Sequence, residues 1–243
     1  MRWFLAFVFL YTIGNETYAA ELRIISADFD PYTYSTSRGG AGAMYEVVQE
    51  VAKRVGQSAK IEFMPWARAQ SIAKTQLNIG ILPLARVPER EVDYVWLLPI
   101  LNDPYVFFAR KDSKFDISTI ESAKSLRIGT FGGSLAEVLL RKMGFKNFKS
   151  VTTDIQNVRM LKADRIDVWV APLSFKNRYK KKGGLGEENL RVGATLIMLN
   201  EYFAASKSLD PETIRKWQLA FKSMKSDGSY AAIMKKYGFE PIK

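Results

Sequence analysis

Residues Pro83–Ile100 read P-L-A-R-V-P-E-R-E-V-D-Y-V-W-L-L-P-I. A short apolar run, Ile79–Leu84, leads into a turn-like V-P-E-R segment, which carries Arg86 and Arg90, and an aromatic and apolar run follows as far as Pro99. An arginine held just after a buried strand presents a planar, permanently charged fork that suits bidentate binding of a carboxylate. The alternative is a solvated R-x-x-E-R charge cluster on a surface loop.

Strand and helix patterns alternate on both sides of this segment, which predicts an α/β fold with a largely parallel sheet. Strands are expected at Leu22–Ala27, Ala59–Met64, Ile79–Leu84, Tyr105–Ala109, Leu126–Thr130, Val151–Thr152, Val168–Ala171 and Leu196–Ala204. Helices are expected at Met44–Val55, Trp66–Thr75, Ala136–Lys142, Ile155–Lys162, Pro211–Ser226 and Tyr230–Tyr237. Asp28–Gly42 is predicted to be a long loop and the basic, Gly-rich segment Phe175–Gly186 an exposed one.

The predicted strands and helices form two successive β-α series, and the carboxyl ends of their strands are candidate positions for a site. Ligands of open α/β sheets bind beyond these ends. If two lobes face each other, one cleft collects all four strand ends, which are Ala27–Asp30, Pro83–Arg90, Thr130–Ser134 and Ala171–Pro172.

Composition excludes several kinds of chemistry. The 243 residues suffice for one large domain or two small lobes, and they include no cysteine and no histidine. Thiol nucleophiles, disulfides, Ser-His-Asp triads and most zinc sites are therefore excluded, and no D-x-D-x-D-G calcium loop is present. We expect no metal and no cofactor. The net charge of +11 indicates a basic surface or an attraction to anionic ligands. No nucleic-acid-binding motif accompanies it, and we expect no nucleic-acid partner.

The N-terminus has the pattern of a secretory signal peptide. Arg2 precedes an apolar run, Trp3–Ile13, and a polar stretch then leads to the small residues Ala19 and Ala20. The apolar run is too short for a membrane-spanning helix, which needs about 20 residues. We predict cleavage near Ala19 and a mature protein in a bacterial periplasm.

Several motifs occur in an order and spacing that resemble the family 3 periplasmic solute-binding proteins, the polar amino-acid receptors of ABC transporters. The resemblance covers essentially the whole chain after the signal peptide. The motifs are S-A-D-F-D-P-Y-T-Y, G-A-M-Y-E-V-V-Q-E-V-A-K-R-V-G, N-I-G-I-L-P-L-A-R-V-P-E-R, R-I-G-T-F-G-G-S, A-D-R-I-D-V-W-V and D-G-S-Y-A-A-I-M-K-K-Y.

The resemblance implies a periplasmic-binding-protein fold, with two α/β lobes joined by two crossing strands and a ligand cleft between them. Its domains would be the signal peptide at 1–19, lobe 1 at 20–108 and 200–243, and lobe 2 at 109–199. Such a monomer binds a small ligand by hinge closure and delivers it to a membrane ABC permease.

The resemblance also implies site residues. Arg90 matches the arginine that binds the ligand α-carboxylate. Phe29 and Tyr32 lie in the loop where the family places an aromatic ring against the ligand, although simple loop packing is the alternative. Ser134 enters a helix after G-G, where its hydroxyl caps the helix, contacts an anion, or does both.

The sequence departs from the family pattern at three places. Pro172 stands where many amino-acid receptors have a carboxylate for the ligand ammonium. Ala85 and Leu135 replace polar residues that commonly contact the ligand carboxylate. Half of α-amino-acid recognition is therefore missing or supplied from elsewhere, and the nearby acids are Asp28, Asp30 and Glu46. Glu46 is more simply explained as a residue that caps or orients the first helix.

Trp66, Arg68 and Arg86 suggest an aromatic and cationic pocket. Trp66 and Arg68 begin a helix at a strand end, and Arg86 adds a cation near Arg90. Such a pocket would favour an anionic or planar ligand. The alternatives are core packing for Trp66 and solvated or ion-paired surface positions for the two arginines.

The leading interpretation is a non-catalytic receptor for a small polar ligand, an amino acid or another carboxylate. The first alternative is a ligand sensor for a membrane signalling protein. The second is a cleft enzyme of dehydratase type, which needs a positioned acid or base. Candidates for that acid or base are Asp28, Asp30, Glu46 and Glu89.

Overall fold

The computed structural model describes residues 22–176 and 189–242, and it has a mixed α/β fold. The predicted signal peptide and most of the predicted loop Phe175–Gly186 lie outside the described residues. The helices are α1 (Ala43–Arg54), α2 (Trp66–Thr75), α3 (Leu135–Lys142), α4 (Asp154–Lys162), α6 (Pro211–Ser226) and α7 (Ser229–Lys236). The strands are β1 (Arg23–Ser26), β2 (Tyr34–Thr36), β3 (Gly39–Ala41), β4 (Ile61–Phe63), β5 (Ile79–Ala85), β6 (Tyr94–Arg110), β7 (Ile128–Phe131), β8 (Phe148–Val151), β9 (Val168–Pro172) and β10 (Leu190–Ser206).

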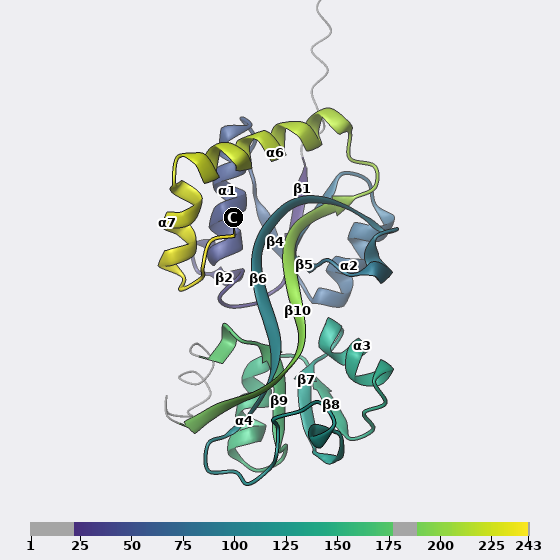
Figure 1. Cartoon of the computed structure of the whole chain (residues 1–243). Helices are drawn as coiled ribbons and strands as arrows, with labels where there is room; N and C mark the ends of the chain where they lie inside the picture. The colour runs from purple at the N-terminus through teal and green to yellow at the C-terminus, as the bar shows by residue number, and fades with distance from the viewer. Residues whose placement is uncertain (1–21, 177–188, 243) are drawn as a thin grey trace, which may run out of the picture.

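Two lobes are joined by two long strands, β6 and β10, of 17 residues each (Figure 1). One eight-stranded sheet runs through both lobes in the order β4-β1-β5-β10-β6-β9-β7-β8. Pairing is parallel within each lobe, between β1 and its neighbours β4 and β5 and between β7 and its neighbours β8 and β9. The crossing strands pair antiparallel with each other and with their neighbours β5 and β9. The predicted two-lobed architecture with crossing strands is therefore confirmed.

The lobe boundaries at 108/109 and 199/200 stay a prediction, because β6 and β10 pass through these positions without a break. Among the described residues, no helix has both the length and the apolar character needed to cross a membrane.

The structure differs from the sequence-based expectations in its strands. β6 begins at Tyr94, eleven residues before the expected strand, and it contains Pro99 and Pro104. The predicted loop Asp28–Gly42 contains the β2–β3 hairpin. Phe175 is buried and its ring lies 5.3 Å from that of Tyr32, so the expectation of an exposed loop is wrong for this residue.

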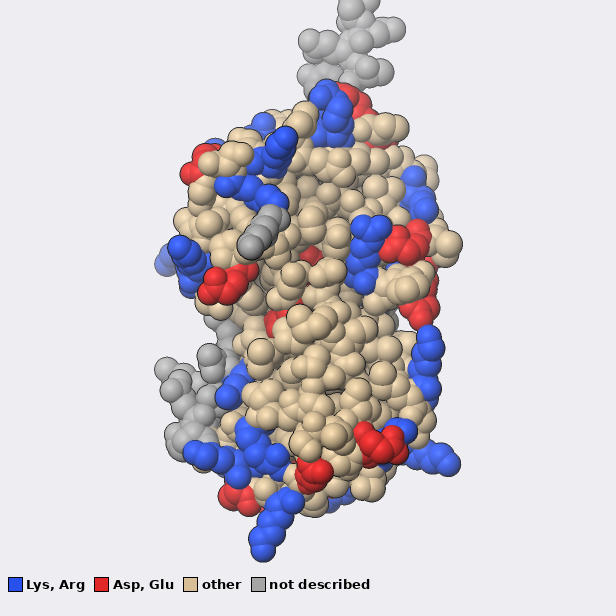
Figure 2. Space-filling model, in the orientation of Figure 1, with Lys and Arg blue, Asp and Glu red and all other residues tan. Residues whose placement is uncertain are grey.

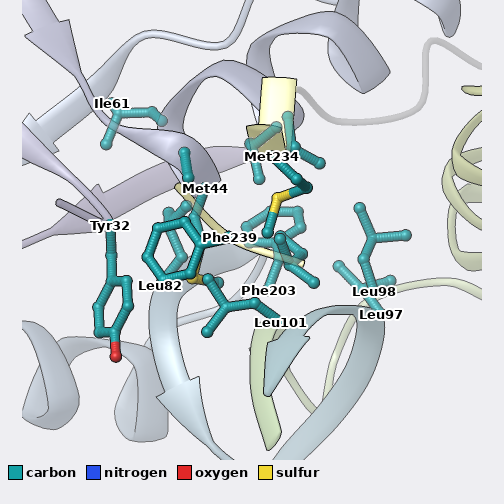
Figure 3. Packing of buried hydrophobic residues seen from close by; sticks show 14 of the residues in the cluster. Tyr32, Met44, Ile61, Leu82, Leu97, Leu98, Leu101, Phe203, Met234 and Phe239 are labelled. Carbon is teal, nitrogen blue, oxygen red and sulfur yellow. The ribbon is translucent and has the colours of Figure 1, made fainter. Parts of the chain in front are cut away.

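The largest hydrophobic cluster includes the core of the lobe that contains α1, α6 and α7, and it continues along the crossing strands to α4 and β9 of the other lobe. Tyr32 stands at the edge of this cluster, and its hydroxyl points away from the aliphatic side chains (Figure 3). A second cluster around Phe107 and Leu140 fills the other lobe. Tyr32 is thus anchored in one core while its polar end faces the region between the lobes.

Candidate functional site

A small cavity of about 30 Å³ lies between the lobes. Its lining residues are Phe29, Tyr32, Trp66, Pro83, Ala85, Arg90, Tyr105, Ser134, Leu135, Phe175 and Glu201. They come from the ends of β1, β5, β7 and β9, as expected from the sequence, and also from the start of α2 and from both crossing strands. Because a water molecule needs roughly 10–15 Å³ by this kind of measure, the cavity has room for about two. A ligand of amino-acid size therefore requires the lobes to separate.

Contacts across the cleft hold the lobes in a closed arrangement. The ring of Phe29 lies 5.2 Å from that of Phe131 of the other lobe, with edge-to-face geometry, and Trp66 of its own lobe supports Phe29 at 5.1 Å. Lys142 on α3 forms an ion pair with Glu89 at 3.1 Å. Both of these side chains are exposed, so the ion pair contributes little and the contact between Phe29 and Phe131 dominates.

Arg90 is positioned by the turn after β5. Its Nη1 donates to the carbonyl oxygen of Ala85 at 3.1 Å, and its Nη2 donates to Oε1 of Gln70 at 3.2 Å. A guanidinium has five N–H donors, and the other three have no hydrogen-bond partner among residues 22–176 and 189–242. The fork is therefore oriented by the protein and retains donors for a ligand.

Tyr32 connects the first lobe to a crossing strand. Its hydroxyl donates to Oδ2 of Asp103 on β6 at 2.6 Å, and the backbone N–H of Ser174, after β9, donates to Oδ1 of the same carboxyl group at 3.2 Å. Tyr32 and Asp103 are both buried. Burial raises the pKa of Tyr32 well above its ordinary value, with the negative charge of Asp103 adding to the effect, so the phenol remains a neutral donor.

Tyr32→Phe is expected to reduce the free energy of unfolding by about 1–3 kcal/mol, since it leaves a buried carboxyl oxygen without its donor. Urea denaturation measures this difference. The matched control is Tyr45→Phe, because the Tyr45 hydroxyl has no hydrogen bond in the described part of the chain; its effect should stay within about 0.5 kcal/mol. Equal stabilities of the two variants would contradict a role for the Tyr32–Asp103 bond.

Ser134 caps α3. Its hydroxyl accepts from the backbone N–H of Glu137 at 3.3 Å and donates to the carbonyl oxygen of Phe131 at 2.6 Å. The carboxylate of Glu137 accepts the backbone N–H of Gly133 at 2.8 Å. This arrangement resembles a capping box and already places a negative charge at the start of the helix. A ligand contact from Ser134 stays a prediction.

Three predicted site residues do not line the cavity. Asp28 is exposed and accepts hydrogen bonds from the backbone and hydroxyl of Ser35. Arg68 is exposed, since it lies about 200° around α2 from the buried Trp66. Arg86 is bound to Glu91 at 2.8 Å.

The guanidinium of Arg86 also lies over the rings of Trp96 and Tyr202, outside the cavity. The expectation of a pocket with several cations therefore needs correction, because Arg90 is the one arginine among the described lining residues. Lysines and arginines are instead spread over both lobes, while the middle of the visible face carries few of them (Figure 2).

Glu201 and Tyr105 line the cavity but were not predicted from the sequence. Glu201 lies on β10 between Leu199 and Phe203, and all three side chains are buried. Burial raises the pKa of Glu201 to about 8; the charge of Arg90 opposes this rise and that of Asp103 adds to it. The sequence signal that could have identified Glu201 is an acidic residue between Leu199 and Phe203, on the face of a predicted strand that otherwise carries apolar residues.

Among the described residues, no group of acidic side chains is arranged to hold a metal ion. The polar groups that face the cavity are instead one guanidinium, one carboxyl and three hydroxyls, set among aromatic side chains. Such a set can bind a small polar molecule by charge-assisted hydrogen bonds and apolar contact.

The fold and the interlobe cavity define a two-lobed solute-binding protein. Residues 22–240 match the model of the bacterial extracellular solute-binding proteins, family 3, and the chain belongs to this family. No match was found among curated proteins. The family consists of binding and sensor proteins that are generally not enzymes.

Solved structures share this fold at low sequence identity. A histidine kinase sensor domain with similarity to periplasmic binding proteins has a TM-score of 0.82 and 19% identity, over 90% of this chain and 97% of that one. EhuB in complex with hydroxyectoine has a TM-score of 0.80 and 23% identity, over 90% and 88%. The arginine-, lysine-, histidine-binding protein ArtJ from Geobacillus stearothermophilus has a TM-score of 0.79 and 17% identity, over 92% and 97%.

Proposed function

We propose that this protein is a periplasmic receptor that binds a small carboxylate-bearing solute between its lobes and presents it to an ABC transporter. The observation that carries the proposal is the position of Arg90, which lines the interlobe cavity of a solute-binding fold and has N–H groups that no described residue accepts. A guanidinium fork in a water-poor site binds a carboxylate by two charge-assisted hydrogen bonds. Phe29, Trp66 and Ser134 complete the ligand site in this proposal.

Lobe closure provides the signal to the membrane partner. Each lobe supplies part of the cavity wall, with Arg90 on one side and Leu135 on the other. A ligand that contacts both walls stabilises the closed arrangement over an open one, in proportion to its difference in affinity for the two states. The closed form is then the one that the permease recognises.

A ligand sensor for a membrane signalling protein is the second candidate. The fold shared with a histidine kinase sensor domain favours it, because the same closure can be read by a kinase. Permease and ATPase genes beside the gene for this protein would favour transport, and a kinase or cyclase gene would favour sensing.

Native mass spectrometry of protein purified from periplasm, followed by denaturation to identify the released compound, tests the proposal. A compound with a carboxylate is expected. If it is found, deletion of the gene should reduce its uptake by intact cells. A released compound without any acidic group would contradict the role of Arg90, and normal uptake after deletion would favour sensing.

A further inference from the structure

Glu201 is a buried acid placed beside the anchor of Arg90. On β10, Glu201 is directly opposite Ala85 of β5, and the carbonyl oxygen of Ala85 accepts a hydrogen bond from Arg90. Glu201 is 4% exposed, and its side chain lines the same cavity as the guanidinium. The backbone register therefore fixes a carboxyl group and a guanidinium in one small space.

The carboxyl group of Glu201 makes no hydrogen bond and no ion pair of 4 Å or less within residues 22–176 and 189–242. A buried carboxyl without a partner is costly, and natural proteins rarely keep one without a use. Asp103, another buried acid nearby, differs because it accepts hydrogen bonds from Tyr32 and Ser174. Glu201 is thus the acid of the described cavity lining, and its carboxyl group has capacity left for a ligand.

We propose that Glu201 binds the cationic group of the ligand while Arg90 binds its carboxylate, so that the protein selects zwitterions without net charge. The inference rests on the proposed function and adds the class of ligand. It explains how a chain with Pro172 at the usual acidic position still recognises a cation, because the carboxylate comes from a crossing strand instead of the end of β9.

The charge balance of the cavity supports selection of a neutral zwitterion. Arg90 is the basic residue and Glu201 the acidic residue of the described cavity lining, so the two charges balance when a bound cation ionises Glu201. A basic or acidic ligand side chain would have no counter-charge there. The remaining walls include Phe29, Trp66 and Leu135, which offer apolar contact to an uncharged side chain.

Ionisation of Glu201 gives the proposal a pH signature. The groups that face Glu201 are Arg90 after β5, Asp103 and Tyr105 on β6, and Tyr32 after β1. With its pKa at about 8, Glu201 is mostly protonated at neutral pH. A bound cation favours the ionised form, so binding releases a proton. Affinity should therefore rise with pH below about 8, by up to about tenfold per pH unit.

The test uses calorimetric titration of the mature protein with matched probes. L-Valine and L-phenylalanine carry both charges, isovalerate and 3-phenylpropionate lack the ammonium, and L-arginine and L-glutamate carry a further charge. Glycine betaine separates quaternary from primary cations. We expect tight binding of zwitterions with an uncharged side chain or a quaternary cation, and binding weaker by about 30-fold or more for the deaminated acids.

Glu201→Gln keeps the size of the side chain and removes its charge. It should weaken zwitterion binding by about 30-fold or more, abolish the proton release, and leave the affinity for the deaminated acids within about threefold. Glu212→Gln, an exposed position on α6, is the matched control and should change neither affinity nor proton release.

The failure of this inference differs from failure of the proposed function. One result overturns the role of Glu201 and supports the proposed receptor function. In that result the deaminated acids bind, Arg90→Ala abolishes their binding, and Glu201→Gln leaves the affinity for zwitterions unchanged. If wild-type protein binds 3-phenylpropionate as tightly as L-phenylalanine without proton release, the role of Glu201 is overturned even where the variant fails to fold. If Arg90→Ala changes no affinity, the proposed function itself fails.

Discussion

Arg90→Ala is expected to weaken the binding of every carboxylate-bearing ligand by about 100-fold or more. Removing one partner of a buried charge pair costs about 2–5 kcal/mol, because the other charge remains desolvated. The loss has a second component here. Arg90 opposes the rise in the pKa of Glu201, so its removal raises that pKa further and favours the protonated acid. Calorimetric titration with the ligand released from native protein measures the change.

Two further substitutions separate charge from geometry at this position. Arg90→Lys keeps a positive charge but loses the planar fork, so an intermediate loss of about tenfold is expected. Arg86→Ala removes an arginine four residues away that is bound to Glu91 outside the cavity, and it should change affinity less than about threefold. Equal effects of Arg86→Ala and Arg90→Ala would show that general basicity attracts the ligand.

The helices could be predicted closely from sequence, because apolar spacing and caps mark them. The structure has α2 and α6 with the predicted bounds, and Asp210 caps α6 by accepting the N–H of Thr213. The crossing strands could not be delimited in this way. Prolines such as Pro99 normally interrupt a ladder, yet β6 accommodates its prolines in pairing that includes register shifts. The β2–β3 hairpin was missed because its glycines and Ser35 are typical of turns and loops.

The lining of the cavity was predicted in part, because local sequence patterns mark strand ends and helix starts but not the pairing of distant strands. Arg90, Phe29, Tyr32, Trp66 and Ser134 were expected at strand ends and helix starts, and the fold does bring them to one cavity. Glu201 comes from the middle of a crossing strand, where the strand-end rule gives no expectation. Its contact with the cavity depends on long-range pairing with β5, which no local pattern specifies.

Gly42 connects this site to the stability of the first lobe. It precedes α1 with φ of 124° and ψ of 160°, a conformation essentially limited to glycine. A Cβ atom at this position would overlap the backbone carbonyl oxygen of Tyr32. That oxygen accepts the N–H groups of Met44 and Tyr45, so the start of the helix and the loop that carries Tyr32 are one packed unit.

Gly42→Ala is therefore expected to reduce the free energy of unfolding by about 3 kcal/mol or more. Backbone strain at such a conformation costs about 1–3 kcal/mol, and overlap with backbone atoms adds a similar amount. Urea denaturation measures the loss. Ligand affinity should fall as well, because relief of the overlap displaces Tyr32 from the cavity wall and from Asp103.

Gly144→Ala is the matched control. Gly144 has a positive φ of 80°, but nothing lies within 4 Å of a Cβ atom built there. It therefore carries the conformational strain of about 1–2 kcal/mol without the overlap, and it should leave ligand affinity unchanged. If the two variants lose equal stability, strain alone accounts for Gly42, and the close approach of Tyr32 to the start of α1 contributes nothing to the fold. A larger loss for Gly42→Ala with weakened binding would instead establish that helix α1 and the ligand site share one packing constraint.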